Sequence, residues 1–245
     1  MSESNEKIFD RIEKKYIIDA AQMKKIVSVA QKNMKKDKYF KSEIFNIYFD
    51  TDNYDLIIKS IDNPDFKEKF RARSYGGYDK VFLEIKTKLK GDENRVGYKR
   101  RVLITHNNYL KFVSGQKTAL ELAAEKIETD NDLQIAKEVD YLVDYLKLKP
   151  KILVYYDRRS YVSDDGLRIT FDENLGFRDK DLNFRKKVRD KHYFNTKKNI
   201  IMEVKAHGVM PLWLVDVLSK NQVYPVRFSK IGKIYELIKK EAKNV

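Results

Sequence analysis

The chain has 245 residues, and its 51 lysines and arginines against 37 aspartates and glutamates give a formal net charge of +14 at pH 7. Hydrophobic residues make up 42% of the sequence, which suits one folded domain over residues 1–245 and excludes a fully disordered chain. Cysteine is absent, which excludes a disulfide scaffold, a zinc–thiolate site and a cysteine nucleophile. The positive charge indicates an anionic partner, which could be nucleic acid, a membrane surface or a phosphate compound.

The N-terminal ten residues are polar and acidic, unlike a signal peptide, and no apolar run approaches the roughly 20 residues of a membrane helix. We therefore expect a cytoplasmic protein without a membrane segment of its own. Charged residues then alternate with β-forming residues, which predicts strands over residues 9–18, 42–50, 66–75, 80–89, 94–105, 151–163, 167–177 and 199–207. Turn signals at Gly76-Gly77 and at Asp164-Asp165-Gly166 predict two hairpins.

Helices are predicted between and after these strands, over residues 53–60, 107–114, 132–148, 211–219 and 230–242. In the third of them the apolar residues recur at the i, i+3 and i+4 spacing of one buried face. Pro211 suits the first turn of the fourth. Eight strands with a few helices, antiparallel where hairpins can be seen, predict an α+β protein. Closure into an antiparallel β-barrel is one way to remove the edges of such a sheet.

Side chains at i and i+2 share one face of a strand, and this spacing separates charged from apolar residues in most of the predicted strands. The charged rows are Arg11, Glu13 and Lys15; Lys69, Arg71 and Arg73; Glu84, Lys86 and Lys88; Lys99 and Arg101; Tyr156, Arg158 and Ser160; Arg168, Thr170 and Asp172; and Glu203 and Lys205. Two interpretations remain open. Either the charged rows face solvent, as in any half-exposed sheet, or they line a lumen while the apolar faces pack against outer helices.

A set of short motifs accompanies these rows, in the order Lys14-Lys15-Tyr16, Tyr48-Phe49-Asp50-Thr51, Phe70-Arg71-Ala72-Arg73, Tyr75-Gly76, Phe82-Leu83-Glu84-Ile85-Lys86, Tyr156-Asp157-Arg158, Leu167-Arg168-Ile169, Met202-Glu203-Val204-Lys205 and Phe228-Ser229-Lys230. By their number, order and spacing they resemble the VTC domain, the polyphosphate polymerase branch of the triphosphate tunnel metalloenzymes in the CYTH-like superfamily. The resemblance extends over residues 9–238.

The resemblance implies an eight-stranded antiparallel tunnel with basic walls, which binds triphosphate or polyphosphate together with Mn²⁺ or Mg²⁺ held by a glutamate. It implies a polymerase that transfers the γ-phosphate of ATP to a growing polyphosphate chain. A triphosphatase of the same fold and a non-catalytic polyphosphate-binding module stay open as alternatives. ATP and inorganic polyphosphate or triphosphate are then the partners, nucleic acid is not expected, and coupling to a membrane would need a partner protein.

Site residues follow from the resemblance position by position. Glu203 corresponds to the metal-binding carboxylate, and the phosphate-binding cations are Lys15, Arg71, Arg73, Lys86, Arg158, Arg168 and Lys230. Lys99, Arg101 and Lys205 are expected to add substrate-binding charge, with Tyr156 and Ser229 as polar neighbours of the phosphate. Glu84 is expected to pair with Lys86, or alternatively to be a second metal-binding carboxylate.

Two further features of the sequence, its histidines and one strongly basic segment, can be explained without a functional role. The three histidines, His106, His192 and His207, are widely spaced and form no zinc signature. Residues 178–198 hold nine lysines and arginines against three aspartates, a local charge of +6. This segment is either a solvated loop or a basic lip that guides the substrate or the emerging polyphosphate.

Overall fold

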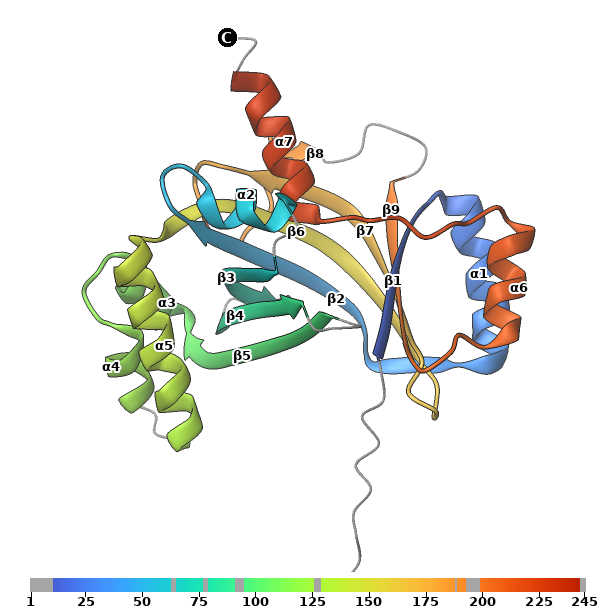
Figure 1. Ribbon diagram of the computed structural model, residues 1–245, viewed down its shortest axis with the longest axis horizontal. Coiled ribbons are helices and arrows are strands. Elements are labelled where there is room, and N and C mark those ends of the chain that lie inside the picture. The colour runs from blue at the N-terminus through green and yellow to red at the C-terminus, as the bar shows by residue number, and fades with distance from the viewer. Residues whose placement is uncertain are drawn as a thin grey trace, which may run out of the picture. The chain divides into compact units, whose positions relative to one another are not determined.

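The structure is a computed structural model that describes residues 11–62, 65–76, 79–90, 95–125, 129–187, 189–192 and 199–242 (Figure 1). Its elements, in chain order, are β1 (Arg11–Ile18), α1 (Ala20–Asn33), β2 (Lys35–Asp50), α2 (Asp55–Asp62), β3 (Phe66–Tyr75), β4 (Lys80–Lys90), β5 (Arg95–Thr105), α3 (His106–Val113), α4 (Ala119–Ala124), α5 (Asp130–Leu146), β6 (Lys149–Val162), β7 (Arg168–Arg178), β8 (Lys191–His192), β9 (Ile200–His207), α6 (Leu212–Lys220) and α7 (Lys230–Ala242).

Eight of the strands follow one another in the sheet in the order β1-β9-β7-β6-β2-β3-β4-β5, and the short β8 pairs with β7. The pairings β1–β9, β2–β3, β3–β4, β4–β5 and β7–β9 are antiparallel. This confirms the predicted α+β class with an eight-stranded antiparallel sheet. In the described residues β1 and β5 are the two ends of the strand order, so hydrogen bonding does not strictly close the sheet into the predicted barrel.

Most predicted elements are present with small shifts of their ends. The strand predicted over residues 42–50 is corrected, because β2 begins at Lys35, seven residues earlier. Three elements were not predicted. They are α1, α4 and β8. Helix α1 begins with a capping box, in which the Asp19 carboxylate accepts from the Gln22 N–H and the Gln22 side chain accepts from the Asp19 N–H. Pro211 is the N-cap of α6 and not a residue of its first turn. Phe9, Gly77, Asn94 and residues 193–198 lie outside the described residues.

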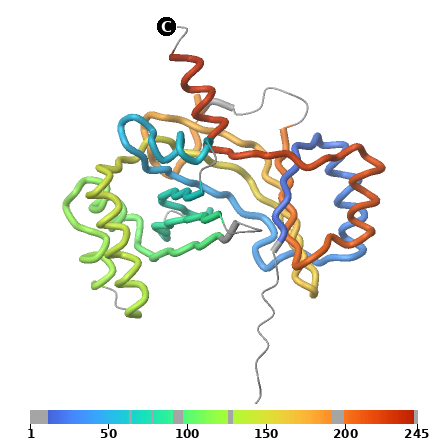
Figure 2. The backbone as a smooth tube through the Cα atoms, in the orientation of Figure 1, coloured from blue at the N-terminus to red at the C-terminus, as the bar shows by residue number. Residues whose placement is uncertain are grey.

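The chain divides into two compact units, which we describe one at a time. The first unit contains residues 1–42, 156–175 and 193–228. In it, the apolar faces of β1, β7 and β9 pack against α1 and α6, which lie side by side in Figures 1 and 2. The strand residues of this core include Tyr16, Ile18, Ile169, Phe171, Met202 and Val204, and the helix residues include Met23, Ile26, Ala30, Leu214 and Val217.

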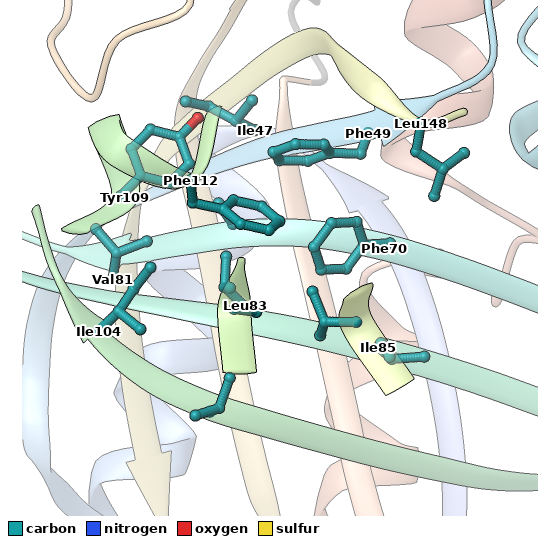
Figure 3. Packing of buried hydrophobic residues seen from close by; sticks show 14 of the residues in the cluster. Ile47, Phe49, Phe70, Val81, Leu83, Ile85, Ile104, Tyr109, Phe112 and Leu148 are labelled. Atoms are coloured by element: carbon teal, nitrogen blue, oxygen red, sulfur yellow. The ribbon is translucent and has the colours of Figure 1, made fainter. Parts of the chain in front are cut away.

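The second unit contains residues 43–155, 176–192 and 229–245. Its core lies between the apolar faces of β2–β5 and the helices α3, α4 and α5 (Figure 3). Val81, Leu83 and Ile85 of β4 alternate there with residues that face the other way, as the i, i+2 spacing predicted. In both units, therefore, helices cover the apolar strand faces, and the charged rows lie on the opposite face.

No helix in the described part of the chain combines the length and the apolar character that crossing a membrane requires.

Candidate functional site

The second unit carries a dense group of cations on the polar face of β3, β4 and β5. Strand register sets it up, because Arg71 of β3 lies opposite Glu84 of β4, which in turn lies opposite Arg101 of β5. One step along the sheet, Lys69, Lys86 and Lys99 are aligned in the same way. We call this group the cationic face, and it consists of Lys69, Arg71, Arg73, Glu84, Lys86, Lys99 and Arg101.

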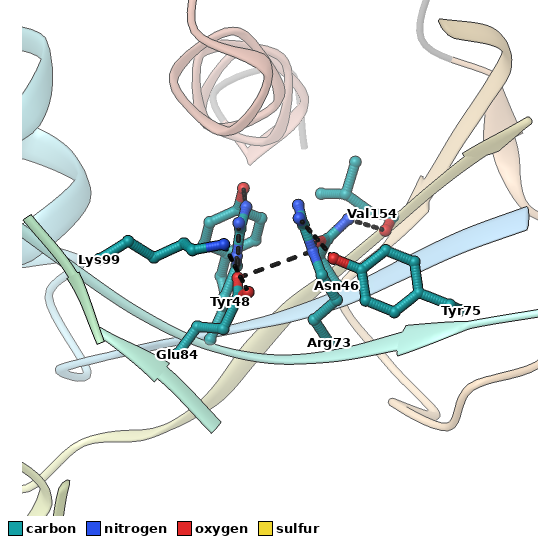
Figure 4. A network of polar contacts seen from close by, with 8 residues as sticks. Asn46, Tyr48, Arg73, Tyr75, Glu84, Lys99 and Val154 are labelled. Atoms are coloured by element: carbon teal, nitrogen blue, oxygen red, sulfur yellow. Dashed lines mark hydrogen bonds and ion pairs between the residues drawn. The ribbon is translucent and has the colours of Figure 1, made fainter. Parts of the chain in front are cut away.

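Glu84 is the centre of the cationic face, and its side chain is 0% exposed. One of its oxygens, Oε2, accepts from Nε and Nη2 of Arg71 at 2.8 and 2.7 Å and lies 3.7 Å from Nε of Arg73. The other, Oε1, has no hydrogen-bond partner and lies 4.0 Å from Lys99 Nζ (Figure 4). Burial raises the pKa of Glu84, but the charges of Arg71 and Arg73 outweigh it and hold this pKa below its ordinary value.

These contacts correct the expectation that Glu84 pairs with Lys86. Lys86 follows Glu84 by two positions on the same strand face, whereas the ion pairs of Glu84 are formed with residues of the neighbouring strands β3 and β5. Direct cross-strand neighbours lie closer together than same-strand neighbours two residues apart. A second metal at Glu84 has no support from this environment, since three cations surround the carboxylate.

Two side chains of β2 complete the cationic face. The Tyr48 hydroxyl accepts from Nη1 of Arg71 at 3.2 Å, and the Asn46 Oδ1 accepts from Nε of Arg73 at 2.7 Å. Burial raises the pKa of Tyr48, but the charges of Arg71, Lys69 and Arg73 and the hydrogen bond from Arg71 lower it to about 8. Both arginines are therefore held in fixed orientations on one wall of the sheet.

The remaining predicted residues of the second unit surround this wall. Lys69 Nζ donates to the Ser229 Oγ at 3.3 Å, which places Ser229 and the start of α7 at Lys230 beside the cationic face. Arg101 is exposed and stacks over the Phe82 ring, with 4.5 Å between its Cζ and the ring centroid. Lys86 and Lys230 are half-buried. Burial lowers the pKa of Lys99 despite the nearby Glu84 charge.

The first unit carries a second group of charges, on the polar face of β1, β9, β7 and β6. Lys15 of β1 lies opposite Glu203 of β9, and Glu13 lies opposite Lys205. Lys205 Nζ is 2.8 Å from Glu203 Oε1 and 3.8 Å from Glu13 Oε2, while Lys15 Nζ is 3.3 Å from Glu13 Oε1. We call this group the balanced face, and it consists of Glu13, Lys15, Asp37, Arg158, Arg168, Asp172, Glu203 and Lys205.

Each arginine of the balanced face has an acidic partner of its own. Nε and Nη2 of Arg158 donate to the two carboxylate oxygens of Asp172 at 2.6 and 2.8 Å, and Asp172 is completely buried. Burial disfavours the charged guanidinium, but Asp172 keeps the pKa of Arg158 well above its ordinary value. Nη2 of Arg168 lies 2.8 Å from Asp37. Tyr156 is buried beneath Arg158, whose Cζ is 5.3 Å from the ring centroid.

The balanced face has the donors that a hard divalent cation prefers. Glu203 and Glu13 approach the same ammonium group, that of Lys205, so two carboxylates converge where one positive charge now lies. Burial and the charge of Glu13 raise the pKa of Glu203, but Lys205 and Lys15 hold it below its ordinary value. In the described residues no group of three histidine, aspartate or glutamate side chains gathers as a metal site. A cation here would therefore need phosphate oxygens or water as its other ligands.

The structure thus locates every predicted site residue. Five lie on the cationic face, Ser229 and Lys230 lie beside it, and the other six lie on the balanced face or next to it. The roles that the resemblance assigns to these residues stay predictions. Asn46, Tyr48 and Asp172 are close partners of predicted arginines that sequence reasoning did not assign to the site. The sequence did contain a signal for Tyr48. Phe45, Ile47 and Phe49 occupy the apolar face of β2, so the alternation of side chains places Tyr48 on the polar face.

Comparison with known proteins adds an independent result. The sequence model of the VTC domain family matches residues 10–238. Subunit 4 of the vacuolar transporter chaperone complex from Schizosaccharomyces pombe (strain 972 / ATCC 24843) is 28% identical over 144 residues, which cover 54% of this chain and 20% of that protein. The chain thus spans about a fifth of the length of this curated relative.

Solved structures resemble the chain at low sequence identity. HpAC1 from Hippeastrum, an adenylyl cyclase candidate described as having a dominant triphosphatase activity, aligns with a TM-score of 0.51 and 15% identity over 90% of this chain and 93% of its own. PH1819 from Pyrococcus horikoshii OT3 aligns with a TM-score of 0.45 and 16% identity over 93% and 99% of the two chains. The likeness to HpAC1 is one of fold.

Proposed function

The chain belongs to the VTC domain family, and we propose that it is a polyphosphate polymerase, which transfers the γ-phosphate of ATP to the end of a growing inorganic polyphosphate chain. The observation that carries the proposal is the cationic face, where six lysines and arginines accompany the single buried carboxylate of Glu84 and three of them lie within 4.0 Å of it. Such an excess of charge is costly unless an anion compensates it. A polyanion with closely spaced charges, such as a polyphosphate chain, matches this row of cations.

Phosphoryl transfer depends mainly on positioning and on neutralising the charge of the phosphate oxygens. Arg71 and Arg158 suit this task because each guanidinium is already oriented by a buried carboxylate, Glu84 in one case and Asp172 in the other. An arginine held in this way loses little freedom when it binds a phosphate oxygen. The acceptor phosphate is itself anionic, so the reaction needs no general base on the protein.

We assign the metal-holding role to Glu203, with Glu13 as a second carboxylate beside it. When bound, Mn²⁺ or Mg²⁺ would neutralise phosphate charge and polarise the phosphoryl group that is transferred. Lys15 and Lys205 are the cations next to these two carboxylates. These lysines balance the charges of Glu203 and Glu13, and in the metal-bound protein they would be available to phosphate oxygens.

The test is incubation of the protein with ATP and Mn²⁺, followed by gel analysis of polyphosphate and by assay of ADP and free phosphate. A polymerase yields long chains together with one ADP for each phosphate incorporated. Cleavage of the products by a polyphosphate-specific phosphatase identifies the chains. Chains without ADP, or ADP without chains, would contradict the proposal.

The same experiment separates two alternatives. Release of free phosphate without chains would make the protein a triphosphatase, the activity that is described for HpAC1 with the same fold. Tight tripolyphosphate binding without any turnover would make it a binding module. Efficient displacement of protein-bound tripolyphosphate by duplex DNA would contradict the polymerase, the triphosphatase and the binding module alike, because it would show a general affinity for polyanions.

A further inference from the structure

A strongly basic segment of the second unit lies outside the cationic face. Residues 178–190, which we call the docking loop, contain six lysines and arginines, and five of them are exposed: Lys180, Arg185, Lys186, Lys187 and Arg189. Two of the five pair with nearby acids, Lys186 with Glu43 and Lys187 with Asp181. Exposed pairs of this kind contribute little to stability, and they leave the loop with a net positive surface.

The sixth cation, Arg178, is buried and holds the two ends of the docking loop together. Its Nη1 donates to both carboxylate oxygens of Asp190 at 3.1 and 2.9 Å, and the two residues are each 7% exposed. Its Nε and Nη2 donate to the backbone oxygens of Asp181 and Asn183 at 2.8 and 2.5 Å. One guanidinium therefore binds the loop at three separate points.

The middle of the docking loop is held by an aromatic anchor. Phe184 is 1% exposed and belongs to the core of the second unit. Its ring centroid is 4.9 Å from that of Tyr109 and 6.0 Å from that of His106. The anchor lies directly before the exposed Arg185, Lys186 and Lys187, so these three cations begin from a fixed point of the backbone.

Holding the docking loop in one conformation costs free energy, and this cost needs an explanation. Neighbouring cations repel one another, and a buried ion pair such as Arg178–Asp190 must overcome the loss of solvation of both charges. A loop that only stayed soluble would relieve the repulsion by remaining mobile. A rigid cationic surface, in contrast, lowers the entropy cost of binding an anion.

We propose that the docking loop is a preformed binding surface for the distal part of a long inorganic polyphosphate chain, distinct from the cationic face. The identity of the anion rests on the proposed function. Nucleic acid is the poorer match, because single-stranded nucleic acid binds on exposed aromatic side chains, and the aromatic residue in the described part of this loop, Phe184, is buried. Polyphosphate has no bases to stack and needs charge alone.

The experiment compares two triple variants that lose the same charge. The first, K180Q/R185Q/R189Q, removes three exposed cations of the docking loop and keeps its anchors Arg178, Phe184 and Asp190. The control, K24Q/K25Q/K32Q, removes three exposed lysines of α1 in the first unit. Binding of long-chain polyphosphate and of tripolyphosphate is measured by calorimetry in about 0.15 M salt, where distant charges are screened.

We expect the docking-loop variant to bind long-chain polyphosphate about tenfold or more weakly, since each lost contact with a polyanion lowers affinity. Tripolyphosphate affinity should stay within about twofold of the wild type, because a short anion engages the cationic face alone. An unchanged affinity for the long chain, or an equal loss in the control variant, would overturn the proposal. A loss of duplex DNA binding as large as that of polyphosphate would overturn the choice of partner.

A single substitution, D190N, tests whether the surface is preformed. It adds one positive charge to the loop but weakens the Arg178–Asp190 pair. Simple charge attraction predicts tighter binding of long-chain polyphosphate, whereas a preformed surface predicts weaker binding. These binding measurements need no turnover, so they stand even if the protein makes no polyphosphate, and thus the two proposals can fail separately.

Discussion

The two units treat their arginines in opposite ways. On the balanced face of the first unit, four cations meet four carboxylates, and Arg158 donates to both oxygens of Asp172. On the cationic face of the second unit, Arg71 and Arg73 share a single oxygen of Glu84, and Lys99 faces the other oxygen at 4.0 Å. On both faces the charged rows alternate with apolar residues that pack in a helix-covered core of their own unit, and the two faces differ in the number of acids.

This difference separates two tasks that phosphoryl transfer requires. A face with as many carboxylates as cations carries no net charge. A divalent cation bound to its carboxylates would add two positive charges, which the phosphate oxygens of the substrate would balance. A face with excess positive charge attracts an anion in proportion to that excess. We therefore expect metal dependence to follow residues of the first unit, and phosphate affinity to follow residues of the second.

The largest expected effect is a loss of stability when Glu84 is neutralised, because Arg71, Arg73 and Lys99 share this one carboxylate. Glu84→Gln should lower the free energy of unfolding by about 3–5 kcal/mol, because it leaves buried cations without compensation. Asp172→Asn uncovers one arginine and should lie at the lower end of that range. Urea denaturation of both variants measures the difference.

Added tripolyphosphate provides the control for this comparison. An anion that binds the folded state stabilises it by mass action. It should raise the melting temperature of Glu84→Gln more than that of Asp172→Asn, since the excess charge is in the second unit. A larger loss in Asp172→Asn, or equal rescue of the two variants, would contradict the distinction between the faces.

The next effect concerns the metal. Glu203→Ala should reduce Mn²⁺-dependent turnover by about 10²-fold or more, the size of effect seen when a charge-stabilising group is removed from a transition state. Tripolyphosphate binding without metal should remain, because the cationic face is intact. Glu173→Ala is the matched control, since Glu173 also lies in the first unit but pairs with Arg159 instead. Full activity of Glu203→Ala would remove Glu203 from the site.

A pH dependence should distinguish the cationic face. The pKa of Tyr48 is lowered to about 8, so the hydroxyl is neutral at pH 7 and becomes an anion among the cations as the pH rises. Tripolyphosphate affinity should then fall by about tenfold between about pH 7 and about pH 9.5, which corresponds to about 1.4 kcal/mol. Tyr48→Phe should make this fall clearly smaller, and the remainder should come from Lys99, whose pKa is lowered as well. Tyr98→Phe, which changes an exposed tyrosine of β5, should keep the whole fall.

The same ionisation acts on stability with the opposite sign. Because the pKa is lower in the folded state than the ordinary tyrosine value of about 10, the unfolded chain binds more protons between about pH 8 and about pH 10. The wild type should therefore gain stability over Tyr48→Phe as the pH rises through this window, and the gain should be absent at pH 7. A wild type and a variant with parallel pH profiles would exclude Tyr48 as the titrating group.

Strand alternation made much of the fold and the charged rows predictable, because side chains alternate between the two faces of a strand whichever strands are its neighbours. Sheet pairing was not predictable in the same way. Glu84 illustrates this, since sequence reasoning assigned it to Lys86 on its own strand, while the register places Arg71 opposite it. Alternation places Tyr48 and Asn46 on the polar face of β2, but their contacts with Arg71 and Arg73 were missed because the pairing of β2 with β3 depends on a register that one sequence does not reveal.

The unpredicted helix α1 shows a different limit. Asp19 and Gln22 have the spacing of a capping box, and Met23, Ile26 and Ala30 line the buried side. Three apolar residues among lysines are a weak periodic signal, and packing against α6 and the first-unit sheet is what stabilises the helix. Local pattern thus predicts elements best where they are long and strongly apolar on one side, as in α5.

The smallest expected effect tests how Arg73 is held. Asn46 is 1% exposed, accepts from Arg73 Nε at 2.7 Å and donates to the Val154 oxygen at 3.3 Å. Asn46→Ala should lower the free energy of unfolding by about 1–3 kcal/mol, because two buried groups lose their partner. Tripolyphosphate affinity should fall about threefold, because an arginine that is no longer oriented must be ordered on binding.

Asn33→Ala is the matched control for that variant, because Asn33 donates to the Val29 oxygen from an exposed position in the first unit. It should change stability by less than about 0.5 kcal/mol and leave tripolyphosphate affinity as it is. If Asn46→Ala lowered stability but left affinity unchanged, Arg73 would be a structural cation, and the excess charge that binds phosphate would reside in the remaining lysines and arginines of the cationic face.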